Sequence, residues 1–122
     1  MVKSVIILCE DGPFGKNSVE ESIRMAAGLL AVGDIEDSKV ILLSDAVYFL
    51  DKNLKPEVLR MDDFANIKRL IELSDLQIYV HDNALDFAGI KASDLILPDN
   101  VKIIDIKQIS KLVLEAEMCF KY

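Results

Sequence analysis

The sequence predicts an α/β fold, a single domain in which an open sheet of about five mostly parallel strands lies between layers of helices. Two observations lead to this prediction. Residues 3–9 and 39–43 are continuous apolar runs rich in β-branched side chains, the pattern of strands covered on both faces. Segments with helical spacing alternate with strand-like segments along all 122 residues, and this order builds βαβ units and a three-layer parallel sheet.

The elements are expected in a regular order along the chain. They are strands over 3–9, 39–43, 77–81, 101–105 and 117–122, and helices over 18–33, 62–74, 83–89 and 107–116. Ser18 and Glu21 have the spacing of a capping box at the first helix, and Gly33 supplies its end. Asp82 is expected to cap the short helix that starts at Asn83. The last strand alternates polar and apolar residues, which predicts an edge strand.

Composition limits the kinds of function. A chain of 122 residues with 52% hydrophobic content fits one domain over residues 1–122, and its net charge of −7 argues against direct, phosphate-driven nucleic-acid binding. No apolar run approaches the roughly 20 residues that cross a bilayer, and the start lacks a signal-peptide cleavage site, so a cytoplasmic protein is expected. The two cysteines lack metal-site spacing and suggest neither a zinc site nor a disulfide framework. We predict no metal and no cofactor.

A binding site in such a sheet is expected beyond the carboxyl ends of the strands, where the strand order reverses. Three segments converge there: residues 10–17, 44–51 and 81–83. The candidate ligand-binding residues in them are Gly12, Phe14, Gly15, Lys16, Asp45, Asp82 and Asn83.

The loop over 10–17 has glycines and a lysine but not the phosphate-binding loop motif. Its glycines are three residues apart, Pro13 removes an amide donor, and Asn17 separates Lys16 from Ser18. Either the loop is a tight turn with a helix cap, or the free amides of the helix start attract a small anion.

Cys9 and His81, each at the end of a predicted strand, are the candidate catalytic residues. An imidazolium beside Cys9 would lower the pKa of its thiol and favour the thiolate; alternatively, Cys9 is a small buried apolar residue. His81 is the chain's one histidine. Either a neighbouring carboxylate fixes its tautomer for chemistry, or it makes a single structural hydrogen bond.

Several segments, in this order, resemble the DsrE/DsrF-like family, most closely its TusC/DsrF branch of sulfur-relay proteins. They are 13-PFG-15, 20-EESIRMAAGLLA-31, 42-LLSDAVYFL-50, 55-KPEVL-59, 78-IYVHDNALDFAGI-90 and a final strand ending in an aromatic residue. The resemblance covers nearly the whole chain and implies a flavodoxin-like α/β domain that forms homo-oligomers or hetero-oligomers with DsrE/DsrH-like subunits. In DsrE-type subunits, a cysteine just after the third strand carries a persulfide, and the relay supports tRNA thiolation or sulfur oxidation.

His81 stands where the resemblance implies that cysteine, and an imidazole cannot hold sulfane sulfur. Three functions therefore remain open: an accessory sulfur-relay subunit, a persulfide carrier that uses Cys9, and a small-molecule or anion-binding module. Residues 47–50 are apolar enough to form either a subunit interface or part of the core. The first hypothesis implies a sulfurtransferase component that lacks the usual active-site cysteine.

Overall fold

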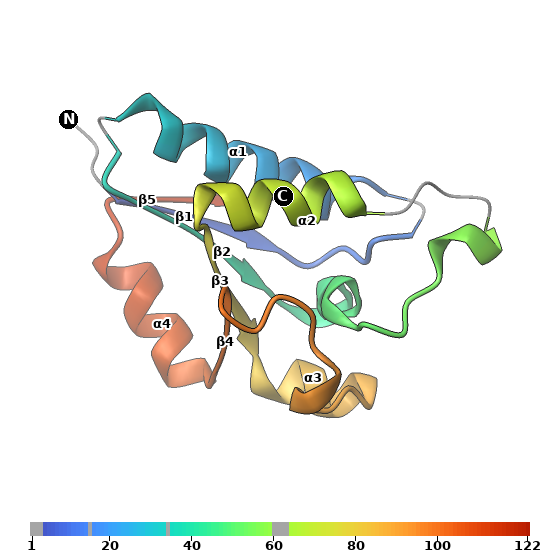
Figure 1. The fold of residues 1–122 in the computed structure, drawn as a ribbon. Helices are drawn as coiled ribbons and strands as arrows, with labels where there is room; N and C mark the ends of the chain where they lie inside the picture. The colour runs from blue at the N-terminus through green and yellow to red at the C-terminus, as the bar shows by residue number, and fades with distance from the viewer. Residues whose placement is uncertain (1–3, 15, 34, 60–63) are drawn as a thin grey trace.

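The computed structural model describes residues 4–14, 16–33, 35–59 and 64–122. It contains one five-stranded sheet in the order β4-β3-β2-β1-β5, in which every pair of neighbouring strands is parallel (Figure 1). The strands are β1 (Ser4–Cys9), β2 (Asp37–Leu42), β3 (Gln77–His81), β4 (Val101–Ile104) and β5 (Met118–Lys121). The predicted fold class is confirmed.

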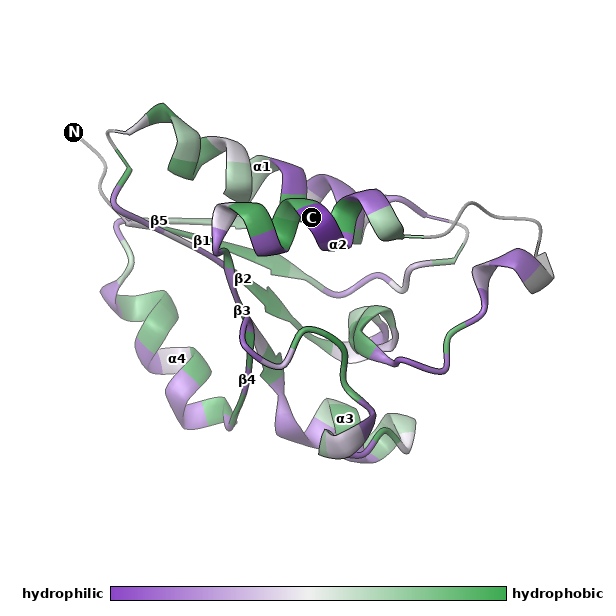
Figure 2. Ribbon diagram, in the orientation of Figure 1, coloured by the Kyte–Doolittle hydropathy of each residue, from purple (hydrophilic) through white to green (hydrophobic). Residues whose placement is uncertain are grey.

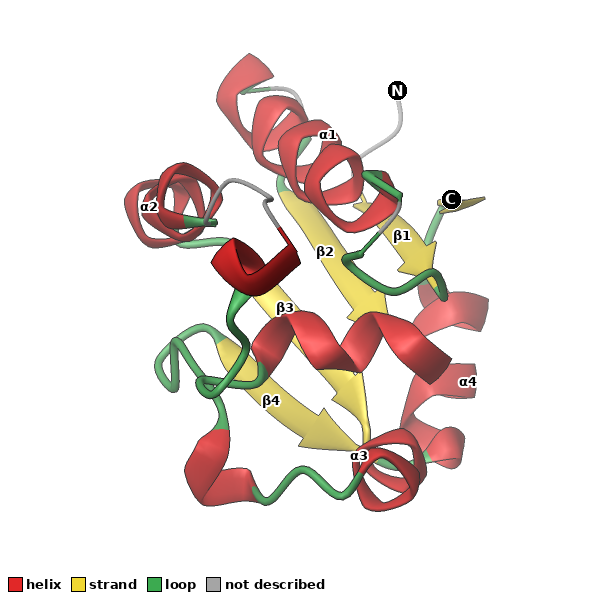
Figure 3. Ribbon diagram, turned by 90° about the vertical axis from the view of Figure 1, so that its right-hand side faces the viewer, coloured by secondary structure: helices red, strands yellow, loops and turns green. Residues whose placement is uncertain are grey.

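Helices cover both faces of the sheet. Helices α1 (Ser18–Val32) and α2 (Ala65–Ser74) pack side by side on one face, and α4 (Ile106–Glu115) lies on the other (Figure 1). Short elements cross the carboxyl ends of the strands: the 3-10 helix η1 (Ser44–Leu50) and helix α3 (Asp82–Ala88), which contact each other. Figure 3 shows α3 at the arrowheads of β3 and β4. Two further 3-10 turns, η2 (Pro56–Leu59) and η3 (Ala92–Asp94), complete the order.

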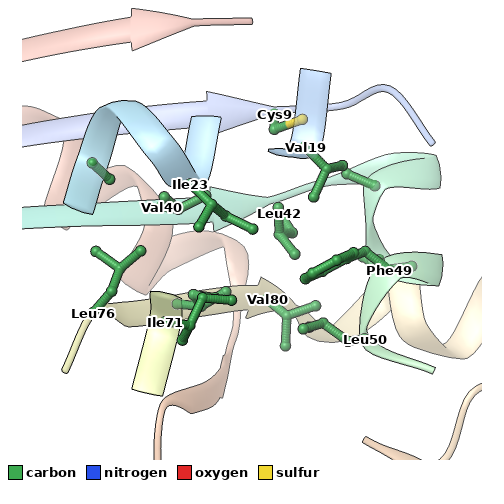
Figure 4. Packing of buried hydrophobic residues seen from close by; sticks show 14 of the residues in the cluster. Cys9, Val19, Ile23, Val40, Leu42, Phe49, Leu50, Ile71, Leu76 and Val80 are labelled. Atoms are coloured by element: carbon green, nitrogen blue, oxygen red, sulfur yellow. The ribbon is translucent and has the colours of Figure 1, made fainter. Parts of the chain in front are cut away.

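The continuous apolar runs of the strands supply two cores because successive side chains point to opposite faces. Toward α1 and α2 the strands present Cys9, Leu42 and Val80, which pack with helix residues such as Ile23 (Figure 4). Toward α4 they present Ile6, Ile41 and Ile104, which form a smaller cluster with Ile109 of α4. Figure 2 shows apolar residues along the central strands of the sheet. Within the described residues, no helix is both long and apolar enough to cross a membrane.

The start of α1 differs from the expected capping box. Asn17 is the N-cap residue and makes no side-chain cap hydrogen bond. Instead of accepting from Glu21, the Ser18 hydroxyl donates to Asp11 Oδ2 at 3.2 Å, because the loop after β1 brings that carboxylate to the helix. The helix ends as predicted at Gly33, whose φ of 87° is in the left-handed region.

A capping box does form at the start of α4. Asp105 Oδ1 accepts from the Gln108 amide at 2.8 Å, and the Gln108 side chain accepts from the Asp105 amide at 3.1 Å. The start expected for α2 at residues 62–63 lies outside the described residues, and the described helix begins at Ala65. The expected cap of α3 is also wrong: His81 occupies the N-cap position, and Asp82 is the first residue of the helix.

Candidate functional site

A cavity of about 290 Å³ opens beyond the carboxyl ends of β2 and β3. Its walls come from η1, from α3 and from the end of β3, and are formed by Ser44, Asp45, Tyr48, His81, Asn83, Ala84, Phe87 and Ala88. The strand order reverses elsewhere, between β1 and β5, where the chain returns after β4. The cavity therefore lies at the expected end of the sheet but not at the point of reversal.

Ser44 sets the course of η1 across the strand ends. Its φ of 49° lies in the left-handed region, which costs free energy for a residue with a side chain. This conformation turns the chain sharply after β2, so that Ser44, Asp45 and Tyr48 face the cavity. The next residues of η1 point the other way, into the core between the sheet and α1: Ala46, Val47, Phe49 and Leu50 are buried.

The stretch 47–50, which the sequence left open as interface or core, is thus mostly core. Val47, Phe49 and Leu50 are buried, and the Phe49 ring packs edge-on against Phe64 with 5.3 Å between ring centroids. Only Tyr48 reaches the surface, with 37% of its area exposed.

His81 ends β3 at the inner wall of the cavity. Its side chain is 20% exposed, and its Nε2 atom is buried without a hydrogen-bond partner among the described residues. The nearest carboxylate oxygen, Asp82 Oδ1, is 3.7 Å from Nε2, beyond hydrogen-bonding distance, and accepts instead from the Asn83 amide at 2.6 Å. Nε2 therefore has hydrogen-bonding capacity at the cavity that no described side chain uses.

Helix α3 divides the remaining candidate residues between two surfaces. Asn83 lines the cavity together with Phe87, one turn further along, which is 93% exposed. Asp82 does not line it, and faces a second hollow on the far side of α3 that includes Lys91 and Ile103.

The loop after β1 lies beside the cavity but does not form its wall. Gly12 approaches η1 so closely that a Cβ there would lie 3.4 Å from the Asp45 Cβ. Lys16 is exposed and pairs with Asp11 at 3.6 Å, and Phe14 is half-buried outside the cavity. Gly15 lies outside the described residues.

Cys9 and His81 are not brought together. Cys9 is 0% exposed and lies at the end of β1 near Val19 of α1 (Figure 4). Burial raises the pKa of its thiol above the ordinary value of 9.0, outweighing the nearby Ser22 hydroxyl, which lowers it. The alternative in which an imidazolium activates Cys9 therefore has no geometric basis, and the thiol form is favoured.

Five residues of the cavity wall were missed as site residues: Ser44, Tyr48, Ala84, Phe87 and Ala88. A signal was present in the spacing of α3, where Asn83 and Phe87, and likewise Ala84 and Ala88, are four residues apart and thus share one face. That face is opposite to the buried Leu85.

Comparisons of the chain with a protein-family model and with solved structures agree with this architecture. A model of the DsrE/DsrF-like family matches residues 3–122. The YchN protein from E. coli is 25% identical, with a TM-score of 0.77 and 100% of both chains covered. Two proteins of unknown function share the fold: MTH1491 from Methanobacterium thermoautotrophicum (16% identity, TM-score 0.67, 100% of both chains) and BT1422 from Bacteroides thetaiotaomicron (14%, 0.67, 98% of this chain and 95% of that chain).

No curated protein matches the chain. The family match spans nearly all of the sequence, and the full-length structural likeness includes the elements that form the cavity. The chain therefore belongs to the DsrE/DsrF-like family, whose general role is in sulfur relay.

Proposed function

We propose that this protein is an accessory subunit of a cytoplasmic sulfur-relay assembly, which contributes a surface to a partner subunit and does not itself carry sulfur after β3. One observation carries the proposal: the side chain that ends β3 at the cavity wall is His81. The family resemblance implies a sulfur-carrying cysteine at this place, and an imidazole nitrogen cannot form the persulfide that a thiolate forms.

Neither cysteine of the chain replaces the missing thiol at the cavity. Cys9 is buried in the core beneath α1 with a raised pKa, so it is both inaccessible and protonated at neutral pH. Cys119 is exposed, but it lies on the edge strand β5, which is separated from β3 by β1 and β2. A relay through this chain would need a thiol that the cavity does not supply.

The cavity has the character of a contact surface. Phe87 and Tyr48 expose aromatic rings at its wall, and aromatic side chains of this kind are enriched among the residues that dominate binding energy at interfaces. A loop of a DsrE- or DsrH-like subunit that packed against the Tyr48 and Phe87 rings would also lie near His81, which lines the same cavity.

The anion-binding alternative has less support from the cavity. Asp45 is the charged side chain on its wall, and no lysine or arginine is among the described residues that line it. An anion would therefore meet a carboxylate without a compensating cation, an unfavourable arrangement at short range.

The proposal is tested by intact-mass measurement after incubation with a low-molecular-weight persulfide donor. The wild-type protein is compared with Cys9→Ser and Cys119→Ser. We expect any added sulfur to reside on the exposed Cys119, so that Cys119→Ser gains none. If Cys119→Ser gains one sulfur atom and Cys9→Ser does not, the protein is a carrier that uses Cys9, and the accessory role is wrong.

A further inference from the structure

The two edges of the sheet differ in their charges. Strand β4 carries Lys102 as its one charged residue. Strand β5 ends in Lys121 and is preceded directly by Glu117, with Cys119 midway between them. We infer that β5 is a self-association surface, which pairs antiparallel with β5 of a second copy about a twofold axis at Cys119.

The backbone of β5 is arranged for such a pairing. Ile6 of β1 is aligned with Cys119, and the Tyr122 amide donates to the Leu8 carbonyl at 2.9 Å. Because successive residues of a strand direct their N–H and C=O groups to opposite sides, Phe120 shares the orientation of Tyr122, toward β1. Cys119 and Lys121 then direct their backbone groups to the other side of β5, on which the described sheet has no further strand. These groups form an open strand edge.

A twofold axis at Cys119 fits this pattern. Cys119 of each copy would exchange two backbone hydrogen bonds with Cys119 of the other, with their Cα atoms about 5.5 Å apart. The Lys121 amide would meet the carbonyl of Glu117 in the second copy. The Glu117 amide already donates to Ser4 Oγ at 3.0 Å, so it is not needed for the new ladder.

The side chains are complementary under the same axis. Glu117 falls opposite Lys121 of the second copy, and Met118 falls opposite Phe120. The Glu117 carboxylate forms no ion pair with any described residue of its own chain. Lys121 Nζ lies 3.0 Å from Glu10 Oε2 and is largely exposed, and an ammonium group has three donors, so it can bind both carboxylates.

The other edge lacks this complementarity. An antiparallel pairing of β4 with itself about a twofold axis at Lys102 would place two lysines opposite each other, and an axis at Ile103 would place Lys102 opposite Ile104, so neither provides a carboxylate for the lysine. The net charge of −7 opposes unspecific association of two copies, so a stable contact needs local matching of opposite charges, which β5 provides.

Charge reversal tests this inference by sedimentation velocity over a concentration series. Glu117→Lys places two lysines opposite each other, and Lys121→Glu places two carboxylates opposite each other. Either variant alone should raise the dissociation constant of the β5 contact about tenfold or more, because like charges directly opposite each other repel. A mixture of the two variants, and the double variant, should associate as the wild type does. Lys107→Glu on the outer face of α4 is the control with a matched charge change.

Short bismaleimide cross-linking provides a second readout that needs no charge variant. Cys119 is exposed and Cys9 is buried, so wild type should form a covalent dimer and Cys119→Ser should not. A wild-type protein that stays monomeric and uncross-linked at all concentrations would overturn the inference, as would single variants that associate like wild type. The measurement contains no sulfur donor and no other subunit, so its result is separate from that of the accessory role.

Discussion

Cys9 and His81 project from opposite faces of the sheet. Cys9, Leu42 and Val80 are aligned across β1, β2 and β3 and share the face that α1 and α2 cover. His81 follows Val80 in the same strand, so its side chain leaves from the other face, two strands away from Cys9. The chain's two candidate reactive groups are therefore separated by the sheet, and this separation supports an accessory role.

Burial of the Cys9 thiol predicts a dependence of stability on pH. Its pKa is raised in the folded protein, so above the ordinary value of 9.0 the unfolded chain releases the thiol proton more readily than the folded one. This contribution to the free energy of unfolding is complete below pH 9.0 and is lost as pH rises toward the folded-state pKa. Urea unfolding between neutral and alkaline pH should show a steeper loss for wild type than for Cys9→Ala. If wild type and Cys9→Ala lose stability equally with rising pH, the raised pKa of the Cys9 thiol is contradicted.

The predicted cap at Ser18 and the observed cap at Asp105 can be compared directly. Asp105→Ala removes a side chain that accepts the Gln108 amide, and should lower the free energy of unfolding by about 0.5–2 kcal/mol. Ser18→Ala is the control, because Ser18 makes no cap hydrogen bond, and its loss should be smaller. The measurement is urea unfolding of both variants. A Ser18→Ala variant that loses more stability than Asp105→Ala would show that the capping box lies at α1 after all.

Phe87 should matter for binding and not for stability. With 93% of its area exposed, Phe87→Ser should change the free energy of unfolding by less than about 0.5 kcal/mol. Leu85→Ala, on the buried face of the same helix, should cost about 2–5 kcal/mol. In a titration with a DsrE-type subunit, Phe87→Ser should weaken association by more than about 1 kcal/mol. If Phe87→Ser binds the partner as wild type does, the cavity wall is not part of the proposed interface.

The sheet was predictable from the sequence because its signal is repeated. Continuous apolar runs mark the central strands, helical spacing marks the segments between strands, and the observed strands start within two residues of those expected. The caps were less predictable. Ser18 matches the capping pattern locally, but Asp11, seven residues earlier, captures its hydroxyl, and only the folded loop brings the two together.

The cavity was predictable in place but not in composition. Parallel topology brings Asp45, His81 and Asn83 to one end of the sheet, and all three line the cavity. The aromatic wall was missed because η1 is apolar over 46–50, and a run without alternation does not reveal which side chain faces outward. The left-handed turn at Ser44 decides that Tyr48 does, and nothing in the local sequence predicts a serine in that conformation.

We propose that the end of β3 is the sulfur-carrying position of the family and that His81, which has no thiol, prevents persulfide formation there in this chain. The most direct measurement is a gain of sulfur. His81→Cys is prepared in the Cys119→Ser background, incubated with the persulfide donor and analysed by intact mass, with Asn83→Cys in the same background as a matched cavity thiol. We predict that His81→Cys gains one sulfur atom and retains it longer than Asn83→Cys. Equal retention by both, or none by His81→Cys, would contradict the account.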